Sequence, residues 1–191
     1  LDGEKMSKSL GNVFNVNDLL VRYEPQVLRW FLISAAHYRS PISFNDGLLD
    51  TAAERVSYFY ETLLKVGRFI EEHDTGFTGP LPGAEITASL LPRFRAAMDD
   101  DFNGARASDP WQEAFRELNE LADTRKAKRK PAAAAGARAL LGQVRIVDKV
   151  YNLLNRDAMD YLLAHRAKAA SRKDLDLDWV SGRIAARLDA R

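Results

Sequence analysis

The stretch Asp46–Ile70, DGLLDTAAERVSYFYETLLKVGRFI, carries the strongest periodic signal of the sequence. Its apolar residues recur at spacings of three and four, which is the period of one face of an α-helix. The positions concerned are Leu49, Ala52, Ala53, Val56, Phe59, Tyr60, Leu63, Val66, Gly67 and Ile70. Asn45 and Asp46 stand where a helix cap is expected, so the sequence predicts one long helix with a buried face.

Shorter periodic segments on both sides of this stretch predict further helices. Before it, Asn15 or Asn17 caps a short helix, and Pro25 suits the first turn of the next one. After it, residues 74–85 form a loop rich in Gly and Pro. The later helices are expected at Ile86–Met98, after a cap at Ser108 with Pro110 in the first turn, at Ala132–Leu154, at Asp157–Arg172 and at Asp178–Arg191. The predicted class is all-α: an antiparallel helical bundle with a short irregular N-terminal arm.

Two of the shorter helices have a clear inward face. The helix from Pro25 carries apolar residues at helical spacing, namely Val27, Leu28, Phe31, Leu32 and Ala35. The helix after Ser108 carries a second set, namely Trp111, Phe115, Leu118 and Leu121. We expect both sets to be buried in the core of the bundle.

The composition of the 191 residues is that of a globular protein, with 46% hydrophobic and 29% charged residues. The net charge of +1 creates no global field, so a nucleic acid would have to meet local basic patches. The absence of cysteine excludes disulfides and thiolate chemistry and favours a reducing, cytoplasmic location. No apolar run is long enough to predict a membrane span. His37, His73 and His165 stand apart at spacings that metal sites do not use, so no bound metal is expected.

The segment Lys5-Met6-Ser7-Lys8-Ser9 is the part of the sequence most specific to one chemistry. It follows Gly3-Glu4 and precedes Leu10-Gly11-Asn12, and its five letters occur by chance in roughly one window per million. Two lysines on a loop can meet the charge that builds up on a triphosphate as pyrophosphate leaves, and small serines let the backbone approach the phosphates. The alternative is a solvated basic loop without a chemical role.

This segment and its flanks resemble the KMSKS signature of class I aminoacyl-tRNA synthetases. The resemblance implies ATP as a substrate, contacted by Lys5, Met6, Ser7, Lys8 and Ser9. Among these residues it implies that Lys8 is the principal ATP contact, with Lys5 as the second catalytic lysine.

Four further stretches are similar to cysteinyl-tRNA synthetase, namely Pro25–Leu32, His37–Pro41, Met98–Asn103 and Arg187–Arg191. The resemblance covers nearly the whole chain and is weakest between Lys126 and Trp179. It implies the ATP-dependent ligation of cysteine to tRNA(Cys), and a helical region like a DALR-type anticodon-binding domain. After Asn103 the family usually continues with Thr-Pro, whereas here Gly104–Pro110 intervenes.

The same resemblance implies that other parts of the enzyme lie outside this sequence. Class I synthetases pair KMSKS with an upstream HIGH-type sequence on a nucleotide-binding fold, and no such sequence occurs here. The family's cysteine-selecting zinc uses ligands that also lie upstream. We therefore expect a C-terminal fragment that is inactive alone and whose partner is the missing catalytic domain. Residues 1–45 would hold the KMSKS loop and its connection to that domain, and residues 46–191 a tRNA-facing bundle truncated at its C-terminus.

Two charged clusters have alternative interpretations. The candidate tRNA contacts are Arg39 and the run Arg125, Lys126, Lys128, Arg129 and Lys130, because clustered cations gain affinity by releasing counterions from phosphates. The alternative for the run is a solvated helix C-terminus, where cations complement the helix dipole. For Asp99-Asp100-Asp101 we expect a structural corner rather than a metal or general-base cluster, because consecutive carboxylates point in different directions.

Two other functions are compatible with the sequence. One is the paralogous ligase that joins cysteine to an amino sugar in mycothiol synthesis, which shares KMSKS and needs no tRNA. The other is a non-catalytic helical interaction module, which has no use for two lysines and two serines in this order. The continuation Ser9–Asn12 and the block Met98–Asn103 favour the tRNA enzyme.

Overall fold

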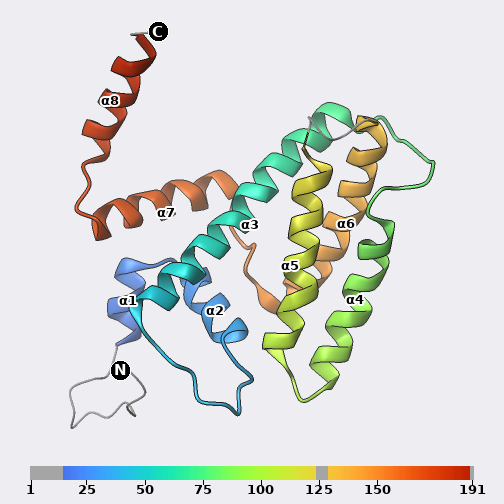
Figure 1. Ribbon diagram of the computed structural model, residues 1–191, viewed down its shortest axis with the longest axis horizontal. Helices are drawn as coiled ribbons and strands as arrows, with labels where there is room; N and C mark the ends of the chain where they lie inside the picture. The colour runs from blue at the N-terminus through green and yellow to red at the C-terminus, as the bar shows by residue number, and fades with distance from the viewer. Residues whose placement is uncertain (1–14, 124–128, 190–191) are drawn as a thin grey trace.

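The computed structural model describes residues 15–123 and 129–189, and Figure 1 shows their arrangement. Every regular element in these ranges is an α-helix, which confirms the predicted class. The bounds are α1 Val16–Arg22, α2 Pro25–Ser34, α3 Asp46–His73, α4 Ala84–Asp99, α5 Gly104–Leu121, α6 Lys130–Tyr151, α7 Ala158–Arg172 and α8 Leu177–Asp189. Within the same ranges no helix combines the length and the apolar character that crossing a bilayer requires.

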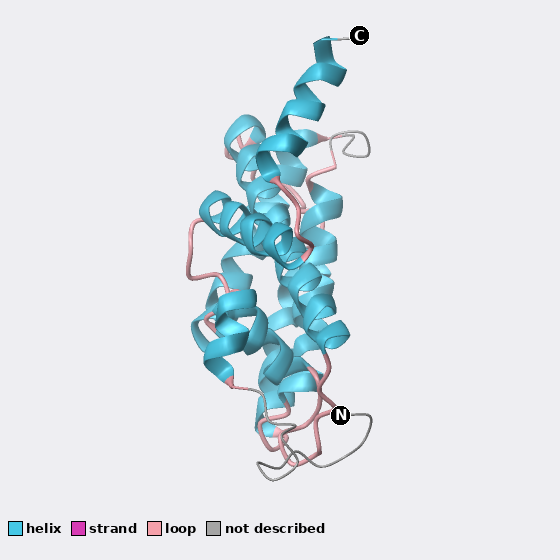
Figure 2. Cartoon of the chain, turned by 90° about the vertical axis from the view of Figure 1, so that its left-hand side faces the viewer, coloured by secondary structure: helices cyan, strands magenta, loops and turns pink. Residues whose placement is uncertain are grey.

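The long helix α3 is the central helix, and four of the other helices pack against it (Figure 1). Helices α5 and α6 pack against it, and α4 packs against α5 and α6, so that these three helices alternate in direction. Helix α2 contacts both α3 and α5, α7 crosses α3, and α1 lies against α7. One hydrophobic core extends from α1 to α7. Helix α8 projects from the end of α7 away from this body (Figures 1 and 2).

An aromatic cluster at the centre of the core joins four helices. The Phe59 ring on α3 is fully buried and meets Trp30 of α2 at a centroid distance of 5.0 Å and Phe115 of α5 at 4.5 Å. Trp111 of α5 meets Tyr151 of α6 at 5.3 Å. Aromatic pairs in edge-to-face or tilted contact add directional attraction to the burial of apolar area. The periodicity of α3 therefore predicted Phe59, the residue on which this cluster is centred.

Two inward positions predicted on α2 are wrong, because the side chains of Leu32 and Ala35 are both exposed. Leu32 is 61% exposed, whereas Trp30, which the periodicity did not single out, is 3% exposed. The buried face of α2 is centred on Val27, Trp30 and Phe31. Because each residue turns the helix by about 100°, Leu32 points away from α3 once Trp30 points toward it. The choice between the two faces is made by the aromatic partners on α3 and α5.

The start of α5 also differs from the prediction. Asn103, rather than Ser108, caps this helix, and its side chain accepts a hydrogen bond from the Arg106 amide at 3.0 Å. Ser108 lies buried inside the helix and donates to the Ala105 carbonyl at 2.7 Å. Pro110 consequently stands within α5 rather than in its first turn. The stretch that departs from the family pattern after Asn103 is thus the first two turns of a helix.

The alanine-rich half of α6 is a site of close backbone approach. Its small residues are buried, namely Ala132, Ala133, Ala134, Ala135 and Ala137. A Cβ atom added to Gly136 would lie 2.3 Å from the Pro82 carbonyl oxygen. The loop after α3 therefore crosses α6 at a point where no side chain fits.

A second set of stacked rings joins α3 to α7. The rings of Tyr60 and Tyr161 lie 3.8 Å apart and nearly parallel, and the His165 imidazole also lies parallel to Tyr161, at a centroid distance of 5.9 Å. Tyr60 also donates to the Leu153 carbonyl at 2.7 Å. These contacts place α7 across the middle of α3.

Replacing Gly136 with alanine should lower the free energy of unfolding by about 1–3 kcal/mol, because the new methyl group must displace the Pro82 backbone. The matched control is Gly142→Ala on the same helix, where no atom lies within 4 Å of the added Cβ. That variant should gain up to about 1 kcal/mol from helix propensity. Urea unfolding followed by circular dichroism measures both changes, and equal effects would contradict the close approach.

Stability should also fall on acidification because of His165. Burial lowers the pKa of His165 below its ordinary value of 6.5, and the nearby Arg172 guanidinium lowers it further. The unfolded chain therefore takes up this proton at a higher pH than the folded chain. The free energy of unfolding should drop as the pH falls from about 6.5 through the folded-state pKa, at no more than about 1.4 kcal/mol per pH unit.

The variant His165→Phe keeps the ring stack and removes the titration. Its unfolding free energy, measured in urea at pH 7.5, 6.5 and 5.5, should decline less steeply than that of the unmodified chain. Parallel declines would show that His165 is not responsible.

Candidate nucleic-acid interface

The predicted ATP-loop residues Lys5, Met6, Ser7, Lys8 and Ser9 lie outside the described residues. The described chain begins at Asn15, whose side chain accepts a hydrogen bond from the Asn17 amide at 2.9 Å and caps α1. Helix α1 is thus the first described element after residues 5–9.

Cations from α7 cap the C-terminal end of α1. Lys168 Nζ donates to the carbonyls of Leu20 at 2.8 Å and Tyr23 at 3.0 Å, and Arg172 Nη1 donates to the carbonyl of Arg22 at 2.8 Å. The last carbonyls of a helix have no partner within the helix, and the negative end of its dipole favours cations. Helix α7 therefore completes α1, although Arg172 and Arg22 stand 150 positions apart.

A buried carboxylate lies at the junction between α1 and α2. Glu24 is the N-cap residue of α2 but makes no side-chain cap bond there, and it is only 5% exposed. It accepts a hydrogen bond from Arg156 Nη1 at 2.5 Å and pairs with Lys168 Nζ at 3.2 Å. The four residues Glu24, Arg156, Lys168 and Arg172 are termed the α1–α7 clasp below.

Sequence reasoning missed the clasp for a physical reason. An acid at the start of a helix and cations near the end of another are common surface features. Glu24 and Arg156 are separated by 132 positions, so no local pattern links them. The only hint in the sequence is the density of cations among residues 166–173.

Two stretches that resemble the same family meet in space. Arg39 Nε lies 2.9 Å from Asp101 Oδ2, and Tyr38 donates through its hydroxyl to Asp101 Oδ1 at 2.9 Å. His37 Nε2 donates to the Asp101 backbone carbonyl at 3.2 Å. These residues, His37, Tyr38, Arg39 and Asp101, form the Arg39 corner. The predicted tRNA contact Arg39 is thus held by a carboxylate, yet its side chain stays 68% exposed.

The acidic block is the turn between α4 and α5. Asp101 and Phe102 both adopt left-handed backbone conformations, with φ of 55° and 53°, and the Phe102 and Asn103 amides bond back to the end of α4. Asp100 pairs with Arg106 at 3.0 Å, away from the Asp101 pair. This arrangement agrees with the predicted structural corner. Among the residues that the structure describes, no three His, Cys, Asp or Glu side chains gather as a metal site would require.

The basic run is only partly within the described ranges. Arg125, Lys126 and Lys128 lie outside them, whereas Arg129 is the N-cap residue of α6 and Lys130 is its first residue. The prediction that the run closes the preceding helix is wrong for these two residues, because α5 ends at Leu121. They stand at the positive end of α6, where the helix dipole adds to their charge and favours an anion.

The projecting helix α8 presents an exposed aromatic ring beside a cation. Trp179 is 64% exposed, and the Arg183 guanidinium lies 5.8 Å from its ring centroid. Ile184 is also exposed. Sequence reasoning took Trp179 only as an apolar residue of the last helix. A tryptophan four positions before an arginine in a weakly periodic helix is the signal that could have found this pair.

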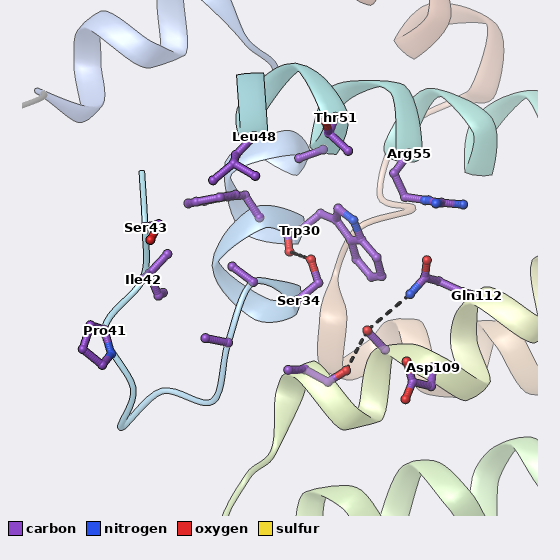
Figure 3. A pocket seen from close by; sticks show the side chains of 16 residues that line it. Trp30, Ser34, Pro41, Ile42, Ser43, Leu48, Thr51, Arg55, Asp109 and Gln112 are labelled. Atoms are coloured by element: carbon purple, nitrogen blue, oxygen red, sulfur yellow. Dashed lines mark hydrogen bonds between the residues drawn. The ribbon is translucent and has the colours of Figure 1, made fainter. Parts of the chain in front are cut away.

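A pocket of about 500 Å³ lies among the end of α2, the connection that follows it, the first turns of α3 and the start of α5 (Figure 3). Its lining mixes apolar and polar side chains, including Trp30, Ile42, Leu48, Arg55, Asp109 and Gln112. Gln112 donates to Ser108 Oγ at 3.4 Å, and Arg55 and Asp109 are both exposed. A cation and a carboxylate at one pocket select neither anions nor cations, so we assign it no ligand.

Two family models match separate parts of the chain. A model described as tRNA synthetases class I (C) catalytic domain matches residues 1–54, and the DALR domain model matches residues 93–147. The first match contains the KMSKS-like motif, α1 and α2, and the second contains the turn between α4 and α5. The Arg39 corner therefore links a residue of one match to a residue of the other.

Curated relatives align with the chain over its whole length. The cysteine–tRNA ligase of Anaeromyxobacter dehalogenans (strain 2CP-C) is 41% identical over 191 residues, which cover 100% of this chain and 37% of that protein. The cysteine–tRNA ligase of Stutzerimonas stutzeri is 37% identical, with 100% and 36% covered. The chloroplastic/mitochondrial cysteine–tRNA ligase of Arabidopsis thaliana is 34% identical, with 100% and 34% covered. The chain spans little more than a third of the length of these relatives.

Proposed function

Because this chain belongs to the cysteine–tRNA ligase family, we propose that it forms part of an ATP-dependent ligase that joins cysteine to tRNA(Cys). The observation that carries this proposal is the alignment of whole ligase segments with residues 1–191, from the KMSKS-like motif onward. In this proposal the chain supplies the ATP loop and a helical region that faces the tRNA. The nucleotide-binding catalytic fold belongs to the remainder of the ligase.

The proposed chemistry of residues 5–9 is electrostatic. When cysteine attacks the α-phosphate of ATP, negative charge moves onto the departing pyrophosphate. Lys8, with Lys5 as the second cation, stabilises that charge in the transition state, and Ser7 and Ser9 let the backbone come near the phosphates. The ligase family implies a zinc ion that selects cysteine, but this chain contains no cysteine ligand. No step of the proposed role therefore passes through a metal held by this chain.

The tRNA-facing role rests on local groups rather than on net charge, which is only +1. The proposed phosphate contacts are Arg39, Arg125, Lys126, Lys128, Arg129 and Lys130. The exposed Trp179 ring, with Arg183 beside it, suits stacking on an unpaired base.

In functional terms we divide the chain into residues 1–45, which serve the catalytic domain, and residues 46–191, which serve the tRNA. We place its work in the cytoplasm, where ATP and tRNA are used for protein synthesis.

In the complete ligase, Lys8→Ala should lower cysteine-dependent ATP–pyrophosphate exchange by about 100-fold to 1,000-fold. The loss should appear mainly in kcat, because the lysine acts on charge that develops in the transition state. Lys149→Ala, which changes an exposed lysine of α6, is the control and should leave exchange unchanged. Undiminished exchange in Lys8→Ala would refute the assignment of the loop. Exchange without tRNA charging would instead point to a ligase for another acceptor.

Binding of tRNA(Cys) transcripts by this chain should tighten in Asp101→Asn. Asparagine tolerates the left-handed backbone, and the change frees Arg39 from an exposed ion pair worth about 0.2–1 kcal/mol, so the gain is at most about fivefold at low salt. Arg39→Gln should weaken binding and reduce its salt dependence by about one counterion. The matched control is Asp100→Asn, which frees Arg106 instead. If neither Asp101→Asn nor Arg39→Gln alters the affinity, Arg39 is not a tRNA contact.

A further inference from the structure

We propose that the α1–α7 clasp positions the N-terminal arm for the ATP reaction, and that Lys168 and Glu24 are positioning residues of the ligase. This inference rests on the proposed function, because it concerns the loop that α1 follows. It assigns a role to four residues that lie far from residues 5–9 in the sequence. Three properties of the clasp support this role.

The first property is the dependence of α1 on its neighbours. The helix has seven residues, which is too short to be stable by itself in water. Val16 and Val21 are 60% and 77% exposed, and only Leu19 within the helix is buried. Most of its apolar surface therefore does not hold it in place. Its direction is determined at its C-terminal end, where α7 supplies the hydrogen-bond donors.

The second property is the geometry at Lys168. Its ammonium group has three N–H donors and three oxygen partners: the carbonyls of Leu20 and Tyr23 and the Glu24 carboxylate, at 2.8, 3.0 and 3.2 Å. The two carbonyls belong to the end of α1, and Glu24 begins α2. One cation therefore fixes the angle between these helices. A change of that angle would break one of the three contacts of the Lys168 ammonium group. The loss is costly because the neighbouring Glu24 is only 5% exposed, so water cannot easily replace the lost partner.

The third property is energetic. A buried ion pair is often no more stabilising than apolar residues of the same volume, but removing one partner strands the other charge at a large cost. The clasp therefore tolerates one arrangement of α1, α2 and α7 and penalises others. Arg172 adds to this restriction, because it pairs with Asp50 of α3 at 3.4 Å and lies 4.5 Å from the centroid of the Tyr23 ring. What the clasp contributes is a defined direction for the arm.

The test uses the complete ligase with Lys168→Met, which keeps an unbranched apolar stem and removes the charge. Misplacing the ATP loop should raise the KM for ATP in pyrophosphate exchange roughly tenfold or more and leave the KM for cysteine unchanged. Lys168→Arg should restore most of the loss. The matched control is Lys173→Met, an exposed lysine one residue beyond α7, which should behave as the unmodified enzyme. All rates are taken well below the melting temperature of each variant.

In Lys168→Met the Glu24 carboxylate keeps its partner Arg156, so that variant loses the contacts to α1 without leaving a buried charge unpaired. The double variant Glu24→Gln/Lys168→Met also removes the carboxylate, and it should retain the raised KM for ATP because the Lys168 contacts to α1 are still absent. Hydrogen exchange at the α1 amides should become at least about tenfold faster in both variants, while α3 and α5 stay protected.

Two results would overturn the positioning role. One is an unchanged KM for ATP in folded variants whose α1 amides exchange faster. The other is α1 exchange that does not respond to loss of the clasp. If the unmodified ligase shows no cysteine-dependent exchange at all, the proposed function fails instead, and the clasp is then judged by the α1 amides alone.

Discussion

The packing of Phe59 between Trp30 and Phe115 is the contact on which the rest of the structure depends. A fully buried ring in this position requires α2 and α5 to approach α3 from two sides at once. That requirement brings the end of α2 against the start of α5, where a Cβ on Gly104 would lie 3.0 Å from the Ile33 carbonyl oxygen. The chain that leaves α2 then runs past the turn between α4 and α5. The Arg39 corner is therefore a consequence of core packing rather than of its own charges, which are too exposed to direct the fold.

Local chemistry was sufficient to predict the class and most of the helices. The period of α3 and the cap at Asn45 are properties of neighbouring residues, and so is the cap of α1 at Asn15. The start of α5 was mispredicted because Asn103 and Ser108 are both good caps, and the choice depends on how α4 ends. The burial of Trp30 instead of Leu32 depends on rings that other helices supply. Both errors arise where tertiary contacts override a pattern with two acceptable solutions.

For the candidate site, the sequence predicted which residues are candidates but not which residues contact them. The lysines of residues 5–9 and the cation Arg39 follow from motif and resemblance alone. The partner of Arg39 lies 62 positions away, and the clasp joins residues 132 to 150 positions apart, distances over which a sequence pattern carries no geometry. Lys130 was placed at the wrong end of a helix because a basic run before a proline suits a helix C-terminus, and Pro131 instead occupies the first turn of α6.

The capping of α1 by α7 also orders events during synthesis. Helix α1 leaves the ribosome well before α7, because the cations that satisfy its last carbonyls follow about 150 residues later. A helix of seven residues does not persist by itself while it waits. Helices α2, α3, α5 and α6, which share the aromatic cluster, are complete before α7 emerges, and α3 provides the surface on which α7 packs. Helix α1 is thus made before the helices of the core and acquires its structure after them.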